Sequence, residues 1–167
     1  MAKKEGKKRL DFLWEFMKTH KMQGFDTASK LDITRRRWSS FKEIDSMMLS
    51  EAERVAALQG YQLVVSYGKN KKLREANITN EIYYRSQLVE SERLQFITDT
   101  LKYHSVSVRQ LTEMGVHYRT IRQCLLKNDI RIALIYKIAE TLKVSVRFKF
   151  VPFVQEKVTI PPDKKTV

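Results

Sequence analysis

The stretch QLTEMGVHYRTIRQCLL (residues 110–126) predicts two short helices joined by a tight turn at Gly115. Its apolar side chains are spaced so that a pair of crossed helices can bury them together. The polar side chains between them stay free to contact another molecule. The apolar set consists of Leu111, Met114, Val116, Ile121 and Leu125.

A diverged copy of this pattern occurs earlier in the chain. The segment RLDFLWEFMKTH (residues 9–20) aligns without gaps with RLQFITDTLKYH (residues 93–104). One residue is dropped in the following turn, and the alignment then continues, pairing Asp32 with Gly115. A match that keeps its order over roughly 60 residues indicates a duplication. We call residues 9–67 the first repeat and residues 93–150 the second repeat.

Four helices and a strand are predicted in the first repeat. Helical spacing covers residues 9–20, 25–31 and 35–42, and a fourth helix ends at Gly60. The alternating residues 61–67 then form a strand. Thr34 is expected to cap the third helix, Asp45 or Ser46 to cap the fourth, and Trp38, Phe41, Met48, Ala52, Val55 and Ala56 to be buried.

The second repeat is predicted to end in a hairpin. Residues 144–154 alternate strongly, residues 157–160 can return beside them, and Pro152 belongs at an edge or a bulge. Between the repeats, the apolar residues 82–89 fit either a strand that pairs with residues 61–67 or a helix. The predicted division is a basic flexible arm (1–8), a first domain (9–67), a basic linker (68–92), a second domain (93–160) and a tail (161–167).

The composition favours a polyanionic partner. The chain has 32 Lys and Arg against 19 Asp and Glu, a formal net charge of +13. Nucleic acid matches such an excess most simply, ahead of an anionic membrane surface or a need for solubility alone. The hydrophobic content of 43% is enough for a packed core.

Several classes of protein are not expected. Cys124 is the only cysteine, which excludes an intrachain disulfide and a cysteine-rich metal site. No apolar run approaches the roughly 20 residues that span a bilayer, and the basic start does not continue as a signal peptide. Catalytic motifs are missing and the acidic residues are scattered. We therefore expect a protein that is not an enzyme, uses no cofactor and is cytoplasmic, associated with the nucleoid.

Around its turn, each repeat resembles the lambda-repressor-like (Cro and XRE-type) helix-turn-helix DNA-binding domain. That family has an Ala and a Leu before a turn of Gly, Ile or Val, and Ser. The matching residues are Ala28, Leu31, Asp32, Ile33 and Thr34 in the first repeat and Leu111, Met114, Gly115, Val116 and His117 in the second. Asp32 stands in place of Gly, and Asp tolerates the left-handed conformation better than most residues. The final helix KIAETL (residues 137–142), running into a strand, is also similar to family members. The resemblance implies a mainly α fold of two tandem lambda-repressor-like domains, each followed by a short β-strand or hairpin.

The resemblance also implies which side chains contact DNA. In this family the start of helix three enters the major groove, where Arg reads guanine and Gln reads adenine for about 1–3 kcal/mol per pair. Three consecutive residues cannot all point one way, so at least one of Arg35, Arg36 and Arg37 is expected to touch DNA. The DNA-binding candidates are Thr34, Arg35, Arg36, Arg37, Ser39, Ser40, His117, Tyr118, Arg119, Thr120, Arg122 and Gln123.

The remaining candidates have weaker assignments. His20 and His104 end equivalent helices, where a cation complements the helix dipole, so a structural role is expected and no metal site. Cys124 is expected in the core. Basic residues outside the helices suit either phosphate contacts or simple solubility. These phosphate-contact candidates are Lys3, Lys4, Lys7, Lys8, Lys69, Lys71 and Lys72.

Two functions follow as expectations. The first is a sequence-preferring double-stranded DNA-binding protein, a transcriptional regulator whose two repeats act as a single-chain pseudo-dimer on an asymmetric site, as a monomer or weak dimer. The alternative is a non-catalytic structural or adaptor protein, of phage or mobile-element type, that reuses the fold and its exposed strand edges to bind protein. RNA binding ranks third, because no motif for stacking single-stranded bases is evident.

Overall fold

The protein is mainly helical with a small antiparallel sheet. The computed structural model describes residues 8–68 and 93–152, which contain eight helices and two strands. In the first repeat these are α1 (Asp11–Thr19), α2 (Gly24–Lys30), α3 (Arg35–Ile44), α4 (Leu49–Ala57) and β1 (Tyr61–Tyr67). In the second they are α6 (Gln95–Tyr103), α7 (Val108–Glu113), α8 (Tyr118–Lys127), α9 (Ile132–Leu142) and β2 (Val146–Pro152). The predicted order of four helices and a strand is thus confirmed in both repeats.

Local signals at helix ends account for the shared boundaries. The Thr34 side chain accepts a hydrogen bond from the Arg37 N–H, as its predicted role as a cap requires. Asp45 and Asn128, at equivalent positions, end α3 and α8 in the left-handed conformation with φ of 51° and 53°. Asp45 therefore does not cap α4, and that prediction is wrong. Asp32 has φ 58° in the turn, as expected of a residue that tolerates this conformation.

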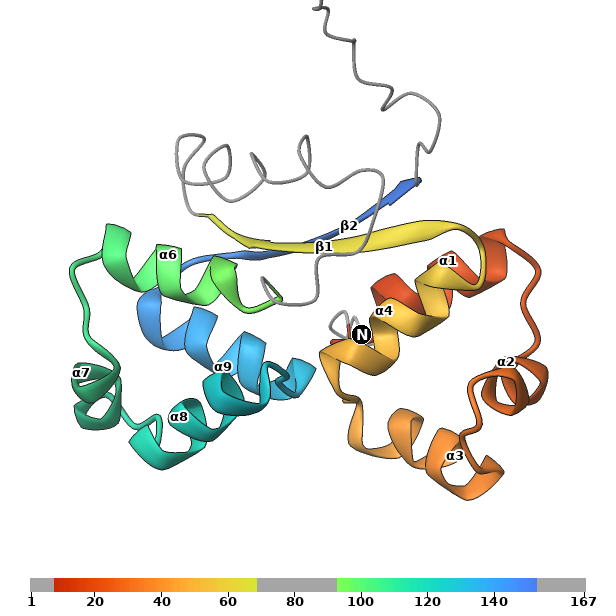
Figure 1. The fold of residues 1–167 in the computed structure, drawn as a ribbon, viewed down its shortest axis with the longest axis horizontal. Helices are drawn as coiled ribbons and strands as arrows, with labels where there is room; N and C mark the ends of the chain where they lie inside the picture. The colour runs from red at the N-terminus through yellow and green to blue at the C-terminus, as the bar shows by residue number, and fades with distance from the viewer. Residues whose placement is uncertain (1–7, 69–92, 153–167) are drawn as a thin grey trace, which may run out of the picture.

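The two strands pair with each other and join the repeats. β1 and β2 run antiparallel, in register from Tyr61 opposite Pro152 to Tyr67 opposite Val146. Figure 1 shows this sheet lying across both repeats, with the helices below it. Pro152 is the last residue of β2, at the strand end where a proline is tolerated. The other predicted strand partners, residues 82–89 and 157–160, lie outside the described residues.

Each strand packs against the first helix of the opposite repeat. The Phe12 ring on α1 stacks on Phe148 of β2, with centroids 3.8 Å apart. In the equivalent contact on the other side, the Tyr67 ring of β1 packs edge to face against Phe96 of α6, with ring centroids 5.0 Å apart. The buried Tyr67 hydroxyl donates to the Ile135 carbonyl at 2.6 Å, and burial raises its pKa well above the usual 10.0. Because of this exchange, both repeats share one hydrophobic core.

A second contact between the repeats lies at the start of α4 and α9. Met48 and Arg131, which are equivalent residues, form an antiparallel β-bridge. The Leu49 N–H donates to the Ile130 carbonyl at 2.8 Å, and the equivalent bond in the other direction is 2.9 Å long. A pair of bonds that exchanges equivalent residues is the signature of a two-fold axis. The repeats are therefore related by a pseudo-two-fold axis through this bridge.

The repeats also cap each other's helices at the axis. The Ser50 N–H in the first turn of α4 donates to the carboxylate of Asp129 at 3.1 Å, and the Ser50 hydroxyl donates to the same carboxylate. Reciprocally, the Ala133 N–H in α9 donates to the Ser46 hydroxyl at 3.1 Å. Ser46 thus caps the second repeat's last helix and not α4, which corrects the predicted cap. The N-terminus of each of these helices depends on a side chain from the other repeat.

An ion pair between the repeats is buried beside this contact. The Arg93 Nε atom lies 2.8 Å from Glu53 Oε2, and the two side chains are only 10% and 6% exposed. Arg93 also donates to the Asn128 carbonyl at 2.7 Å, as the equivalent Arg9 does to Asp45 at 3.0 Å. Breaking such a pair from one side costs about 3–5 kcal/mol, because a buried charge is left without its partner.

Most of the predicted core is buried. Trp38 and Phe41 are 2% and 3% exposed, and Ala52, Val55, Ala56, Leu111, Val116 and Ile121 are buried as well. Met114 was expected inside but is 49% exposed, because it ends α7 beside the turn and extends outward. Met48, Leu125 and Cys124 are only half-buried. For Met48 the reason is its position in the bridge at the axis.

Candidate nucleic-acid interface

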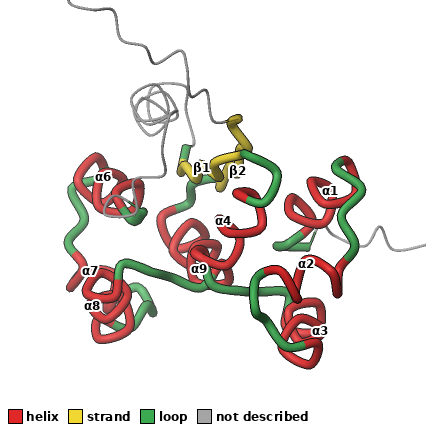
Figure 2. The backbone as a smooth tube through the Cα atoms, turned by 45° about the vertical axis from the view of Figure 1, so that its right-hand side comes forward, coloured by secondary structure: helices red, strands yellow, loops and turns green. Residues whose placement is uncertain are grey.

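The helices predicted to read DNA lie on one side of the molecule. In Figures 1 and 2, α3 and α8 both lie at the end of the helical layer farthest from the sheet. The pseudo-two-fold axis explains this arrangement, since it passes between the repeats at the Met48–Arg131 bridge and relates α3 to α8. One face of the molecule therefore presents both helices, separated by the bridge.

The exposed side of α8 carries the second repeat's candidates. Ile121 is 1% exposed and anchors the helix in the core, whereas all six candidates from His117 to Gln123 are exposed. Arg122 donates to the Tyr118 hydroxyl at 2.7 Å and lies over its ring at 5.8 Å. The Arg119 side chain makes no hydrogen bond or ion pair with the described residues. Its guanidinium therefore keeps all its donors available for a ligand.

The three consecutive arginines of α3 occupy three different environments. The Arg35 guanidinium lies 4.9 Å from the centre of the Phe25 ring. Arg36 is exposed, and its side chain makes no hydrogen bond or ion pair within the described part of the chain. Arg37 contacts Glu51 on α4, through Nη2 to Oε1 at 3.0 Å and Nε to Oε2 at 3.2 Å. The hydrogen bonds that Arg37 donates to the Glu51 carboxylate raise the Arg37 pKa. Arg37 is thus held against α4 by Glu51, although its side chain is 56% exposed, whereas Arg35 and Arg36 make no ion pair with the described residues.

The other predicted contacts are less uniform. Ser39 is exposed, but the Ser40 hydroxyl donates to the Arg37 carbonyl at 2.6 Å, which occupies its donor. Lys8 is exposed, and its main-chain N–H donates to the Asp11 carboxylate at 2.8 Å. The remaining phosphate-contact candidates, Lys3, Lys4, Lys7, Lys69, Lys71 and Lys72, lie outside the described residues.

Sequence reasoning missed three cations beside α8. Lys127, Arg131 and Lys137 border a groove of about 360 Å³ next to the axis. Nothing in the local pattern singles out Arg131, because its position on the axis depends on how the repeats pair.

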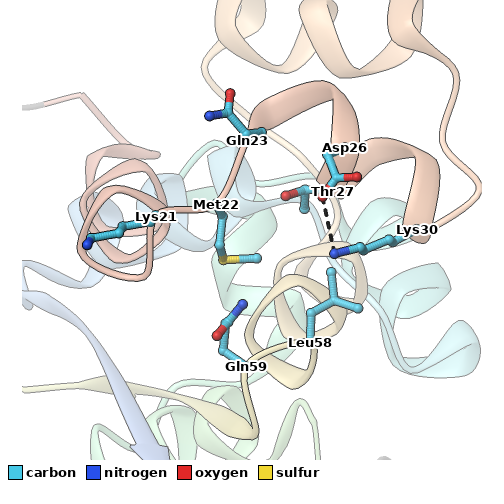
Figure 3. Close-up of a pocket in the computed structure, with 8 residues that line it drawn as sticks. All are labelled: Lys21, Met22, Gln23, Asp26, Thr27, Lys30, Leu58 and Gln59. Carbon is cyan, nitrogen blue, oxygen red and sulfur yellow. Dashed lines mark ion pairs between the residues drawn. The ribbon is translucent and has the colours of Figure 1, made fainter.

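Another hollow lies between the start of α2 and the end of α4. Figure 3 shows Lys21, Gln23 and Leu58 among its lining residues and the 3.1 Å ion pair between Asp26 and Lys30. Its volume of about 140 Å³ is below the roughly 300 Å³ at which small-molecule sites begin. We assign no ligand to it.

Side chains that could hold a metal do not gather in the described residues. No group of three or more His, Cys, Asp or Glu is close enough there to bind an ion. His20 follows α1 as its C-cap and contacts the rings of Phe16 at 4.4 Å and Tyr61 at 5.0 Å. Burial raises the pKa of the half-buried Cys124 thiol, with Asp129 adding to the effect.

Two further observations bear on the class of protein. Among the described residues, no helix has the length and apolarity needed to cross a membrane. Comparisons with protein-family models, with curated proteins and with solved structures find no match to this chain.

Proposed function

We propose that this protein binds double-stranded DNA through the face that presents α3 and α8. The observation that carries the proposal is the pseudo-two-fold pairing of the repeats, which turns both helices to the same side. Dimeric helix-turn-helix proteins present two equivalent helices to half-sites about 34 Å apart. Here one chain supplies both. The formal charge of +13 supports attraction to the phosphates.

The target is an asymmetric site, because equivalent positions of the two helices differ. The first turn of α3 carries three arginines, whereas α8 carries Tyr118, Arg119 and Thr120. Arg119 is the best candidate for reading a base, since its side chain is exposed and makes no bond within the described residues. A good bidentate contact of Arg to guanine contributes about 1–3 kcal/mol of discrimination.

The test begins with selection of bound duplexes from a randomised pool at about 0.15 M salt, where nonspecific phosphate attraction is already reduced. Arg119→Ala should then weaken binding to the selected duplex by roughly 5- to 150-fold, with a much smaller loss on random duplex. Arg147→Ala is the matched control, because this exposed arginine lies on β2, across the molecule from α8. Equal losses from both variants would contradict base reading by α8.

An adaptor that binds protein is the alternative. It is favoured by the two-stranded sheet, in which each strand has one edge unpaired with any other described strand. Leu126 on α8 is also 78% exposed and offers a protein partner an apolar side chain to cover. Failure of the pool selection, together with binding that disappears as salt rises, would favour this alternative.

A further inference from the structure

Two grooves border the axial bridge, one in each repeat. The first, bordered by α8 and α9, has a volume of about 360 Å³, and we call it the open groove. The second, bordered by α3 and α4, has a volume of about 170 Å³, and we call it the closed groove. Met48 and Arg131 line both. The grooves are equivalent under the pseudo-two-fold axis, so their difference in volume must come from side chains.

An ion pair fills the closed groove and has no counterpart in the open one. In the first repeat, Arg37 reaches from α3 to Glu51 on α4, with the shortest N–O distance at 3.0 Å. At the equivalent positions the second repeat has Thr120 and Leu134. A short hydroxyl and an apolar side chain cannot form this bridge. The space that Arg37 and Glu51 fill on one side of the axis is therefore empty on the other.

The open groove combines an apolar floor with a cationic rim. Met48, Cys124 and Leu134 contribute apolar surface, and Lys127 and Lys137 contribute positive charge together with Arg131. None of the three cations has an ion pair or side-chain hydrogen bond with the described residues.

The one acidic side chain of the open groove does not neutralise this rim. Asp129 lines the groove, but its carboxylate already accepts hydrogen bonds from Ser50 and from the Ile130 N–H. These neutral donors hold the carboxylate in place but leave its negative charge, and one carboxylate against Lys127, Arg131 and Lys137 leaves the groove with an excess of positive charge.

We propose that the open groove binds a small amphipathic anion. Its carboxylate or phosphate would lie against Lys127, Arg131 and Lys137, and its aromatic or aliphatic body on the apolar floor. The volume falls within the roughly 300–1,000 Å³ of small-molecule sites. A phosphate of a DNA backbone would use the cations but leave the apolar floor unfilled, so a ligand with an apolar body fits better. This site needs no DNA and so goes beyond the proposed function.

The first experiment compares three probes on the full chain by calorimetry. Naphthoate carries both the charge and the apolar body, naphthamide carries the body alone, and inorganic phosphate carries the charge alone. Naphthoate should bind with a dissociation constant on the order of 1 mM or tighter, and at least about tenfold more tightly than either other probe. The combined Arg131→Gln and Lys137→Gln variant should reduce naphthoate to the level of naphthamide. Equal binding of naphthoate and naphthamide, or unchanged affinity in this variant, would overturn the proposal.

The second experiment fills the groove with the first repeat's own side chains. Combined Thr120→Arg and Leu134→Glu substitutions transplant the pair formed by Arg37 and Glu51, and should abolish naphthoate binding. Circular dichroism and the melting temperature would verify the fold. If this variant does not fold, Cys124→Phe closes the groove from its floor with the residue found at the equivalent position 41. Retention of naphthoate affinity in a folded, filled variant would refute the assignment of the site.

Discussion

Replacing Asp129 by Ala tests whether the repeats form one cooperative unit. Asp129 belongs to the second repeat, but its carboxylate accepts the Ser50 N–H and hydroxyl at the start of α4 in the first. Loss of an N-terminal cap costs about 1 kcal/mol, and loss of the hydroxyl bond about 1 kcal/mol more. The expected total is about 2 kcal/mol, out of a typical folding stability of about 5–15 kcal/mol.

The chain provides its own reporter for this test. Both of its tryptophans, Trp14 and Trp38, lie in the first repeat, so their fluorescence in urea follows that repeat, whereas far-ultraviolet circular dichroism follows all helices. With m of about 1–3 kcal/mol per molar urea, Asp129→Ala should lower both midpoints together by about 1 M. Because Asp129 lies in the second repeat and both tryptophans lie in the first, a shift of the tryptophan transition shows that the substitution destabilises the two repeats together.

Two variants serve as controls. Asp129→Asn keeps a capping oxygen and should lose less than half as much stability. Asp99→Ala removes a carboxylate of the same repeat whose one hydrogen bond with the described residues is to the exposed Gln95 side chain, and should cost less than about 0.5 kcal/mol. A tryptophan transition that stays in place while the circular dichroism transition moves would show that the repeats unfold independently, and would refute the shared core.

Three further predictions can be checked on the same protein. Tyr67→Phe should lower the free energy of unfolding by about 1 kcal/mol at neutral pH. Because the pKa of Tyr67 in the folded state is raised above 10.0, the free energy of unfolding of the wild type should fall by about 1.4 kcal/mol per pH unit relative to the variant as the pH rises above 10. Urea midpoints from pH 8 to 11 measure this, and a difference that does not depend on pH contradicts it. Gly115→Ala should lower the free energy of unfolding by about 1 kcal/mol through backbone strain alone, because Gly115 has φ 101° and a Cβ there would meet nothing within 4 Å. Gly115→Asn should cost less, because Asn tolerates positive φ better than Ala. Equal melting temperatures for the two variants would argue against strain as the cause. Thr120 and Gln123 line the open groove and belong to the proposed DNA face. Naphthoate at several millimolar should therefore weaken binding to a selected duplex in wild type but not in Cys124→Phe, which closes the groove without changing a proposed DNA contact. An equal effect on both proteins would place the competition elsewhere.

Local patterns predicted the elements of this fold well. Helical spacing over residues 35–42 matches the start of α3 at Arg35, and alternation over residues 61–67 matches β1. These signals depend on residues within one or two turns, so one chain segment carries them completely. The repeat itself could also be recognised, because equivalent helices retained matching apolar positions.

Contacts between the repeats could not be predicted in the same way. Alternation shows which face of β2 is buried, but it does not identify β1 as its partner. The predicted cap of α4 was wrong for the same reason, since Asp129, which bonds to the start of α4, comes from the opposite repeat, and Ser46 bonds to the start of α9 there.

Part of the candidate site was open to prediction. Exposure of Arg119 follows from its spacing relative to the buried Ile121. The sequence contains a signal for the ion pair of Arg37 with Glu51, because Glu51 stands at helical spacing from the apolar residues Met48 and Val55. The open groove is visible only when the aligned repeats are compared and the Arg37–Glu51 pair is found replaced by Thr120 and Leu134.

Because β2 packs against the first repeat, the first repeat cannot complete its packing until the ribosome has synthesised the second. Phe12 and Phe16 on α1 stack on Phe148 and Phe150, which are translated long after the first repeat is complete. At about 5–20 residues per second, the wait is on the order of 10 s. During that interval the nascent first repeat carries uncovered aromatic rings and a strand without its partner, the surfaces that chaperones recognise and that aggregate between neighbouring polysomal chains. Translation speed across the second repeat thus becomes a determinant of yield.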